Sequence, residues 1–566
     1  MNDLPPHRHP HPTTRVNELI SLYSDPAACA ATLFCDRYPA DQSAYTIVDR
    51  HLRQIRLTYG DLRDRSTRFA AALAELGVRP GDRVATLMGK SADYLTALLG
   101  IWRVGAVHVP LFTAFAPPAI AFRLERSGAG FVVCDRSQRR KLDPGDDIPV
   151  DAPWRVIVTD EPGDPTGSSG SDERDLHFAD LLAAADEFTP AALGGDAPLI
   201  HIFTSGTTGR PKGVIVPVKA VAGFRIYAEY ALGLVPQDLY WCAADPGWAY
   251  GLYFGILGSL STGVPSVLLD AGFSAELTWS VLSDLGVTNF TAAPTVYRSL
   301  RASNTTAPGP LRLRCASSAG EPLTPEVNGW AVEALGVPVF DHYGQTEAGM
   351  LINNHQHPDL RRPVRNGCMG RSMPGWDLRV LDNAGDVEAP VDTVGRIAAK
   401  VSDSPLAWFA GYDGDPAKTA DKFTADGEWY LTGDAGRMDA EGNFFFSARD
   451  DDVIIMAGYR IGPFDVESVL LTHPDVVDAA VIAVPDAIRG EVIEAYIVTR
   501  PAVTTPAAEL AELAEGLKQL VKTKLAAHAY PRRVHFVDAL PKTPSGKTQR
   551  YLLRDRRRAE LEASNP

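Results

Sequence analysis

The sequence predicts an α/β protein with a large N-terminal domain of layered β-sheets flanked by helices and a small α+β C-terminal domain. From about Leu57 onward, helical and strand-like apolar patterns alternate along the chain, and after about residue 450 the pattern changes to a compact unit. The chain has 566 residues, of which 45% are hydrophobic, so it is long enough for two or three domains.

The first alternating unit predicts a helix followed by a strand. Phe69, Leu73 and Leu76 recur at helical spacing before Gly77, a typical residue just past a helix end. The short apolar run at residues 84–88 follows and is typical of a buried strand. Helix and strand in this order form the repeating unit of a layered sheet.

The same pattern continues further along the chain. Ser91 can cap a helix that Gly105 ends, and a strand is expected at residues 106–111. Similar short apolar runs predict later strands, at residues 131–134, 266–269 and 337–340. The polar, glycine-rich stretch at residues 161–173 is expected to be a loop inserted between sheet elements.

The uncharged run at residues 246–269 is long enough to suggest a membrane span. Residues 262–265, with the sequence Thr-Gly-Val-Pro, interrupt it with a turn signal. We therefore expect a buried helix, a turn and a strand there, and no contact with a membrane.

The last part of the chain predicts a unit with a core of its own. Its elements are two helices and three strands, expected near residues 463–472, 476–484, 491–498, 507–525 and 534–537. The three carboxylates at residues 450–452 repel one another and prefer water, so the junction before this unit is expected to be solvated. The predicted divisions are a tail at 1–14, an N-terminal domain at 15–450 and a C-terminal domain at 451–566.

Composition limits the classes of partner. The net charge of −15 gives no overall signature of nucleic-acid binding, so any anion site must be local. The six cysteines have no C-x-x-C spacing, which disfavours a zinc cluster or a disulfide framework and fits the reducing cytosol. Residues 1–12 lack the apolar core of a signal peptide, and their three histidines, His7, His9 and His11, are interpreted as incidental.

The segment at residues 203–214 carries the strongest functional signal. It follows the apolar run 199–203 and combines glycines, four hydroxyls and cations in one turn; Thr204, Ser205, Gly206, Thr207, Thr208 and Lys212 are the candidate ligands. One lysine charge and one phosphate charge about 4 Å apart interact by about 4 kcal/mol at an effective dielectric near 20. The segment predicts a polyphosphate site, with an ordinary polar surface turn as the alternative.

Neither of two near matches is a Walker phosphate loop. In the first, Pro211 occupies the position of the second glycine when the motif is counted from Gly206. In the second, Gly546 and Lys547 are preceded by Pro541 where the first glycine is required. Proline has no N–H and a fixed φ, so it cannot form that phosphate-facing turn.

Five motifs in order resemble the adenylate-forming superfamily of acyl-CoA synthetases, adenylation domains and luciferases. They lie at residues 204–213, 319–322, 341–347, 429–434 and 541–547, and the resemblance spans roughly residues 40–555. It implies a two-step reaction in which a carboxylate attacks the α-phosphate of MgATP, after which the thiol of coenzyme A displaces AMP. Such a site needs no protein nucleophile, because positioning and charge stabilisation carry the chemistry.

The resemblance assigns the phosphate and adenine contacts. Glu347 is expected to help bind Mg²⁺, a hard cation that prefers oxygen ligands, and Thr346 is expected to contact phosphate. Adenine is expected to lie between Tyr343 and a wall of three residues, with Asp341 also in the nucleotide site; the wall residues are Gly320, Glu321 and Pro322. Considered alone, Tyr343 would more often be a core residue, and His342 has no assigned role.

The resemblance also assigns the sugar and the second domain. Asp434 is expected to bind the ribose hydroxyls together with Arg449, although an Asp in a Thr-Gly-Asp sequence is usually a turn residue. Lys547 is expected to neutralise the carboxylate and the α-phosphate, with a solvated tail lysine as the alternative. The family rotates its C-terminal domain between half-reactions, which implies the remaining roles: Asp451 as hinge, and Gly458 and Arg460 on the coenzyme A side.

The sequence predicts the acyl substrate only through its resemblance to particular members of the family. The residues at 343–347 resemble acetyl- and medium-chain acyl-CoA synthetases, and acetate enzymes carry Trp where this chain has Gly344. Gly344 is therefore expected to open the acyl pocket, with Trp248 and Val296 as further walls or as plain core residues. The predicted substrate is a short- to medium-chain carboxylic acid.

Two alternative functions and one regulatory partner remain open. The first alternative is a free-standing ligase that transfers its acyl group to a carrier protein. The second is a nucleotide-binding regulator without catalysis, which the presence of Lys212, Glu347, Asp434, Arg449 and Lys547 disfavours. The loop of Lys547 also resembles a site of reversible acylation, so a lysine acyltransferase and a deacylase are expected partners.

Overall fold

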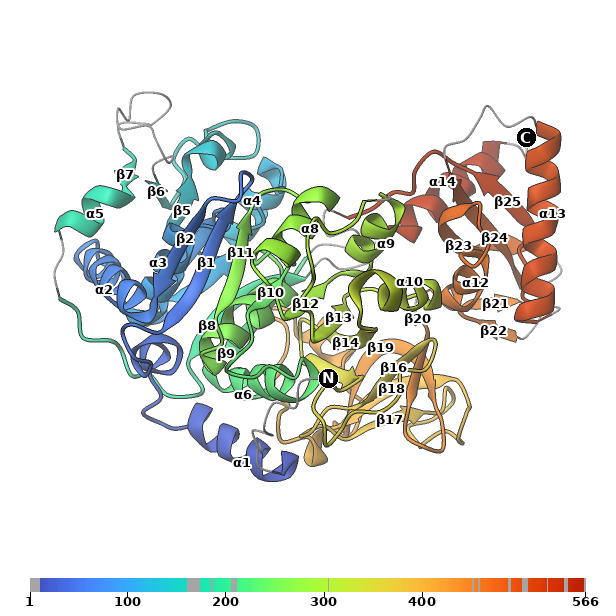
Figure 1. The fold of residues 1–566 in the computed structure, drawn as a ribbon, viewed down its shortest axis with the longest axis horizontal. Helices are drawn as coiled ribbons and strands as arrows, with labels where there is room; N and C mark the ends of the chain where they lie inside the picture. Colours follow the sequence, from blue (N-terminus) through green and yellow to red (C-terminus); the bar gives the residue numbers. More distant parts are fainter. Residues whose placement is uncertain are drawn as a thin grey trace.

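The computed structural model describes most of the chain (Figure 1). The described residues are 11–159, 174–184, 187–204, 211–303, 305–449, 452–456, 459–486, 490–500, 507–526, 528–543 and 548–563. The predicted loop at 161–173 therefore lies outside them. Within the described residues, no helix is long and apolar enough to cross a membrane.

A seven-stranded sheet forms one side of the N-terminal region. Its order is β7-β6-β5-β3-β4-β8-β9, and all neighbours are parallel except the β8–β9 pair. The strands are β3 (Arg83–Leu87), β4 (Val107–Pro110), β5 (Phe131–Asp135), β6 (Arg155–Thr159), β7 (Leu176–His177), β8 (Pro198–Thr204) and β9 (Lys212–Pro217). The accompanying helices are α2 (Tyr59–Glu75), α3 (Ala92–Arg103), α4 (Pro117–Ser127) and α5 (Phe178–Ala184).

These elements follow the local signals of the sequence. Thr58 and Asp61 form a reciprocal capping box at the start of α2, and the Ser91 hydroxyl accepts a hydrogen bond from the Tyr94 N–H at the start of α3. Gly77 and Gly105 follow the two helices with φ values of 97° and 81°, which non-glycine residues rarely adopt. The predicted helices and strands of this region are confirmed.

A thirteen-stranded sheet forms the second part of the N-terminal region. Its order is β17-β18-β19-β20-β16-β15-β14-β13-β12-β10-β11-β1-β2. The strands are β1 (Ser43–Asp49), β2 (Gln54–Thr58), β10 (Tyr240–Cys242), β11 (Ser266–Asp270), β12 (Asn289–Ala292), β13 (Cys315–Ala319), β14 (Val339–Gln345), β15 (Gly349–Asn353), β16 (Cys368–Ser372), β17 (Leu378–Leu381), β18 (Gly395–Lys400), β19 (Trp429–Met438) and β20 (Phe444–Arg449). The run from β1 to β14 is parallel, whereas β15 to β20 pair antiparallel.

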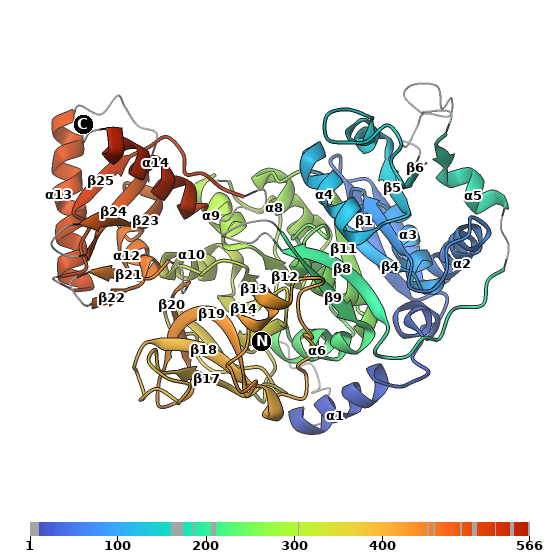
Figure 2. The same ribbon diagram turned by 180° about the vertical axis from the view of Figure 1, so that it is seen from behind.

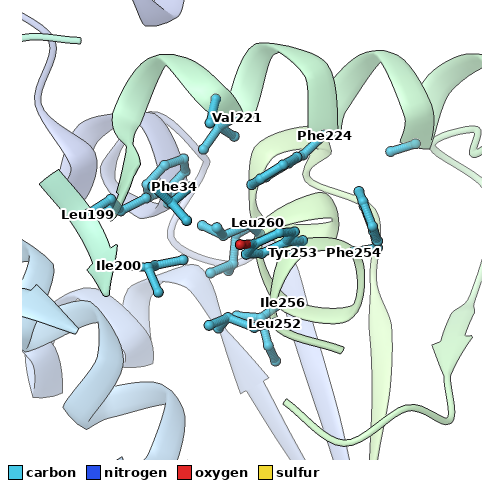
Figure 3. Packing of buried hydrophobic residues seen from close by; sticks show 14 of the residues in the cluster. Phe34, Leu199, Ile200, Val221, Phe224, Leu252, Tyr253, Phe254, Ile256 and Leu260 are labelled. Atoms are coloured by element: carbon cyan, nitrogen blue, oxygen red, sulfur yellow. The ribbon is translucent and has the colours of Figure 1, made fainter. Parts of the chain in front are cut away.

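Helices pack on this sheet and between the two sheets (Figures 1 and 2). They include α6 (Val221–Ile226), the π-helical turns at Tyr227–Ala231 and Gly251–Leu257, α7 (Gly258–Thr262), α8 (Ala275–Asp284), α9 (Pro294–Ala302), α10 (Pro325–Leu335) and α11 (Pro416–Ala420). The uncharged run thus forms a buried helix that ends at Gly263 and continues into β11, as predicted. Figure 3 shows this helix in the core, where the Tyr253 ring stacks on Phe224 with centroids 4.4 Å apart.

The C-terminal unit is a separate lobe at the right of Figure 1, with α13 on its outer side. Its strands are β21 (Ile454–Met456), β22 (Tyr459–Ile461), β23 (Val476–Asp486), β24 (Gly490–Thr499) and β25 (Arg533–Phe536), and its helices are α12 (Pro463–Leu470), α13 (Ala507–Lys524) and α14 (Arg550–Ala563). A hydrophobic core of its own runs from Ile454 to Leu553. The predicted order of its elements is confirmed.

Two expectations at the ends of the domains are wrong. The predicted tail ends before residue 14, because α1 (Pro12–Tyr23) begins at a buried proline and Arg15 pairs with the buried Glu229 at 2.8 Å. At the junction, Asp452 is not solvated. Its side chain is 11% exposed and pairs with Arg550 at 3.4 Å and Arg554 at 2.5 Å, so two cations of α14 neutralise it.

Candidate active site

The described ends of the predicted phosphate segment belong to two paired antiparallel strands, β8 and β9. Thr204 at the end of β8 lies opposite Lys212 at the start of β9, so the connecting residues start and end at neighbouring positions. The Thr204 Oγ1 atom is buried and, within the described residues, accepts and donates no hydrogen bond. An unsatisfied buried hydroxyl is costly, so this position suits a polar ligand. The predicted ligands Ser205, Gly206, Thr207 and Thr208 lie outside the described residues.

Residues 412–413 pair with strand β9. Val214 pairs with Tyr412, and the Asp413 N–H donates to the Gly213 carbonyl at 2.9 Å. The Lys212 ammonium lies 4.4 Å from the centroid of the Tyr412 ring, a cation–π distance. Lys212 has no carboxylate partner in the described part of the chain, so its charge remains available to an anion.

Glu347 and Thr346 follow β14 and are held from two sides. The Tyr412 hydroxyl donates to Glu347 Oε1 at 2.6 Å, and the Tyr253 hydroxyl donates to the Thr346 carbonyl at 3.1 Å. The second carboxylate oxygen of Glu347 has no hydrogen-bond partner among the described residues. One carboxylate with a free oxygen beside the predicted phosphate segment suits Mg²⁺, which is commonly bound by one or two carboxylates together with substrate phosphates.

Asp434 lies at the centre of a compact hydrogen-bonded group. β19 and β20 pair Asp434 directly with Arg449, whose Nε lies 3.2 Å from Asp434 Oδ1. Asp434 Oδ2 accepts hydrogen bonds from the Tyr343 hydroxyl and from Gln345 Nε2, the latter at 2.7 Å. The structure thus brings together the two residues predicted for the ribose and the tyrosine predicted for adenine.

The predicted adenine wall begins where β13 ends. Ala319 pairs with His342 of β14, so Gly320, with φ of 98°, follows directly beside the nucleotide motif. The Glu321 carboxylate forms an ion pair with Arg298 at 2.8 Å. Burial raises the pKa of Asp341 to about 8, although backbone N–H groups of Leu323 and His342 oppose the shift. At neutral pH this carboxyl is therefore largely protonated and can donate a hydrogen bond.

His342 has a structural role. Its Nε2 atom lies 2.8 Å from the Asn354 carbonyl, so Nε2 carries the proton and Nδ1 accepts from the Tyr227 hydroxyl at 2.8 Å. Tyr227 is in turn bonded to the Tyr250 hydroxyl at 2.6 Å. Burial lowers the pKa of His342 to about 3, so the ring is neutral and supports β14 from behind.

The three predicted acyl-pocket residues lie in different packing environments. Trp248 packs against Phe112 and Phe115, with centroids 5.2 and 5.5 Å apart. Val296 is a half-buried residue of α9 that packs against the core around β10–β14. Trp248 and Val296 thus pack against different hydrophobic clusters.

The structure gives a reason for a glycine at position 344 that the sequence did not reveal. A Cβ atom at this position would lie 2.3 Å from the Gly349 carbonyl oxygen and 2.7 Å from Met350 Cα, because β14 and β15 approach closely at a bulge. Any side chain therefore requires the strands to move apart. A larger residue such as Trp at position 344 must therefore displace these backbone atoms as well as occupy acyl space, and the open-pocket interpretation of Gly344 stays a prediction.

The C-terminal site residues Asp451, Gly458 and Lys547 lie outside the described residues, as does the side chain of Arg460. Around Lys547, the chain is anchored on both sides. Lys542 pairs with Thr548 across the loop and forms an ion pair with Asp478 at 2.6 Å. Beyond it, Arg550 makes hydrogen bonds of 2.7, 2.9 and 3.1 Å to Glu467 of α12.

Sequence reasoning missed three residues that the structure brings into this site. Tyr412 contacts Glu347, Tyr430 donates to Gln345 Oε1 at 2.9 Å, and Lys422 donates to the Thr432 carbonyl at 2.8 Å. Gln345 lies within the motif at residues 341–347, so its place in the site could have been predicted. Tyr412 lies 65 residues from Glu347 in the chain and had no local signal, because their contact depends on how residues 411–413 pair with β9.

Comparison with known proteins identifies the family of the chain. Residues 33–405 match the AMP-binding enzyme family, and residues 465–547 match the AMP-binding enzyme C-terminal domain. The chain is 34% identical to the acetyl-coenzyme A synthetase of Bacillus subtilis, with 90% of each chain covered.

Two solved structures are similar over nearly the whole chain. The acyl-CoA synthetase of Brucella canis is 42% identical, with a TM-score of 0.73 and coverage of 97% of this chain and 98% of that one. The anthranilate CoA ligase AuaEII, solved with anthranoyl-AMP, is 26% identical, with a TM-score of 0.82 and coverage of 95% and 98%. The chain therefore belongs to the AMP-binding enzyme family of the adenylate-forming superfamily, among the acyl-CoA synthetases.

Proposed function

We propose that the chain is an AMP-forming acyl-CoA synthetase that uses ATP, Mg²⁺ and coenzyme A to activate a short- to medium-chain carboxylic acid. The observation that carries this proposal is a chain of contacts between motif residues: Lys212 of β9 lies against the Tyr412 ring, and the Tyr412 hydroxyl donates to Glu347. The Asp434–Arg449 pair joins Tyr343 and Gln345 of the Glu347 motif. Family membership supports the same reaction.

In the first half-reaction, a carboxylate oxygen forms a bond to the α-phosphorus, and the bond to the bridging oxygen of pyrophosphate breaks. Lys212 supplies positive charge to the phosphates, Asp434 and Arg449 orient the nucleoside, and Glu347 offers an oxygen to Mg²⁺. Lys547 is proposed to neutralise the two anions that must approach each other.

In the second half-reaction, the thiolate of coenzyme A attacks the acyl carbonyl carbon, and AMP leaves with both electrons of the broken C–O bond. We propose that the C-terminal lobe turns about Asp451 between the two steps, which removes Lys547 and presents Gly458 and Arg460 to coenzyme A. The separate core of this lobe supports movement as one body.

Pyrophosphate exchange across straight-chain acids of increasing length tests the substrate class. Each buried methylene should strengthen binding by about 0.8 kcal/mol, or roughly fourfold, until the pocket is full. The aromatic packing of Trp248 with Phe112 and Phe115 supports an apolar acyl site. A clear optimum at acetate would contradict the proposed chain length while leaving the reaction class intact.

The acceptor can be tested directly. Release of AMP that depends on free coenzyme A supports the proposal, whereas release that depends only on a purified carrier protein favours the carrier ligase. Absence of pyrophosphate exchange with every acid, despite binding of ATP, would instead favour a non-catalytic regulator.

We also propose that acylation of Lys547 switches the enzyme off. Acylation removes the positive charge, so it should block adenylation but spare thiolysis of supplied acyl-adenylate. Intact-mass spectrometry and separate assays of the two half-reactions check this. Equal loss of both half-reactions would contradict the proposed role.

A further inference from the structure

Four aromatic side chains pack together beside the nucleotide site. The ring centroid of Phe409 lies 5.1 Å from that of Tyr412, 6.3 Å from that of Phe423 and 6.0 Å from that of Tyr430. The ring centroids of Phe423 and Tyr430 are 5.7 Å apart. Most of these pairs meet edge to face, a favoured geometry that restricts each ring. We call these four residues the aromatic cluster. Its two hydroxyl groups are therefore held in place by packing.

The first hydroxyl of the aromatic cluster serves the phosphate side. Tyr412 is 5% exposed and donates to Glu347 Oε1 at 2.6 Å. Its backbone is fixed by the pairing with Val214 and by a 2.9 Å hydrogen bond from its N–H to Thr419 Oγ1. Because a carboxylate oxygen can only accept, the hydroxyl of this buried tyrosine is the donor in the contact with Glu347.

The second hydroxyl of the aromatic cluster serves the nucleoside side. Tyr430 is 4% exposed and donates to Gln345 Oε1 at 2.9 Å. This contact sets the orientation of the amide, so that Gln345 Nε2 points toward the Asp434 carboxylate at 2.7 Å and the Thr432 carbonyl at 2.7 Å. The two tyrosines thus support different carboxylates from one packed group.

We propose that Tyr412 is a positioning residue that occupies one oxygen of Glu347 and thereby presents the other to Mg²⁺ and the phosphates, while Tyr430 orients Asp434 through Gln345. This division of roles rests on the proposed function, because it assigns Glu347 to the metal side and Asp434 to the ribose side. Neither tyrosine touches the reacting atoms in this account.

The decisive experiment compares Tyr412→Phe with Tyr430→Phe, each of which removes one buried hydroxyl from the same cluster. For each variant, the Mg²⁺ concentration that gives half-maximal ATP–pyrophosphate exchange is measured, together with calorimetric binding of AMP without metal. Tyr412→Phe should raise the required Mg²⁺ concentration by about tenfold and leave AMP affinity within about twofold, because a lost support weakens a metal ligand. Tyr430→Phe should weaken AMP binding by about fivefold and leave the Mg²⁺ requirement unchanged, as expected for one lost hydrogen bond.

A purely structural role predicts a different result. Both variants would then lower the melting temperature to a similar extent and shift both readouts in parallel, and that result would overturn the proposal. An unchanged Mg²⁺ requirement in Tyr412→Phe would overturn it as well. If the wild-type chain bound MgATP without exchange, the proposed function would fail, and the Mg²⁺ dependence of ATP binding in Tyr412→Phe would still decide the role of Tyr412.

Discussion

The nucleotide site and the base of the Lys547 loop hold their charged groups by different means. In the nucleotide site, tyrosine hydroxyls on packed rings orient the carboxylates of Glu347 and Asp434. At the loop base, Arg550 and Arg554 pair directly with Glu467 and Asp452. The first arrangement leaves charge available for a substrate, whereas the second uses its charges to anchor a loop. Five predictions test this contrast, from the largest expected effect to the smallest.

Lys547→Ala should slow acyl-adenylate formation by roughly 100- to 1,000-fold, the loss expected when one preorganised charge-stabilising group is removed. Thiolysis of supplied acyl-adenylate should change little. Lys542→Ala is the matched control, because Lys542 lies at the base of the same loop and pairs with Asp478 at 2.6 Å. Adenylation at the wild-type rate in Lys547→Ala would refute the mechanism.

Asp341 should make the N-terminal lobe less stable as pH rises. Its folded-state pKa of about 8 lies above the ordinary value of 3.8, so the folded state holds the extra proton and stability falls between about pH 4 and pH 8. In Asp341→Asn, the free energy of unfolding should fall by about 2–4 kcal/mol less over that pH range than in the wild-type chain, because the titrating group is gone. Urea unfolding at several pH values measures it.

Glu494 should make the stability of the C-terminal lobe depend on pH in the opposite direction. Burial opposes the shift, but hydrogen bonds from His535 and Arg557 lower the pKa of Glu494 below its usual 4.5. Its contribution to stability is therefore present above about pH 4.5 and is lost as pH falls through the folded-state pKa. Parallel pH profiles in the two lobes would argue against both assignments.

Arg550→Ala should destabilise the C-terminal lobe by about 2–3 kcal/mol, because it leaves the buried Glu467 carboxylate without its cation. Arg550 is partly exposed, so water screens the ion pair and the loss stays below that of a fully buried pair. Arg556→Ala is the matched control on the same helix. Its ion pair with Glu560 is largely exposed, so the loss should stay below about 0.5 kcal/mol. Denaturant unfolding followed in the full chain separates the two, and equal losses would remove the special role of Glu467.

Tyr343→Phe should weaken AMP binding by about 1 kcal/mol, because Asp434 loses one donor while Gln345 and Arg449 remain. The ring itself is retained, so the proposed stacking against adenine should persist. Calorimetry with AMP measures the change. A loss as large as that of Asp434→Ala would show that the three donors do not act separately.

The predictable part of the fold is the part with local signals. Ser91 with Gly105 marked a helix, and the interrupted run at 246–269 marked a helix, turn and strand, as the structure confirms. The antiparallel strands β15 to β20 were not predicted individually, because short strands paired at a distance carry weak local patterns. The solvated junction failed at Asp452 for a related reason, since its two cations come from about 100 residues away.

By itself, the sequence determined the family and the order of the main elements, and it predicted the residues of the nucleotide site, because each of these depends on short motifs and local periodicity. Only the tertiary structure decided that Gly344 lies where β14 and β15 approach closely, and that Tyr412 donates to Glu347 and Tyr430 to Gln345. Both facts depend on strand register and on packing between distant segments, and such contacts leave no periodic trace along the chain.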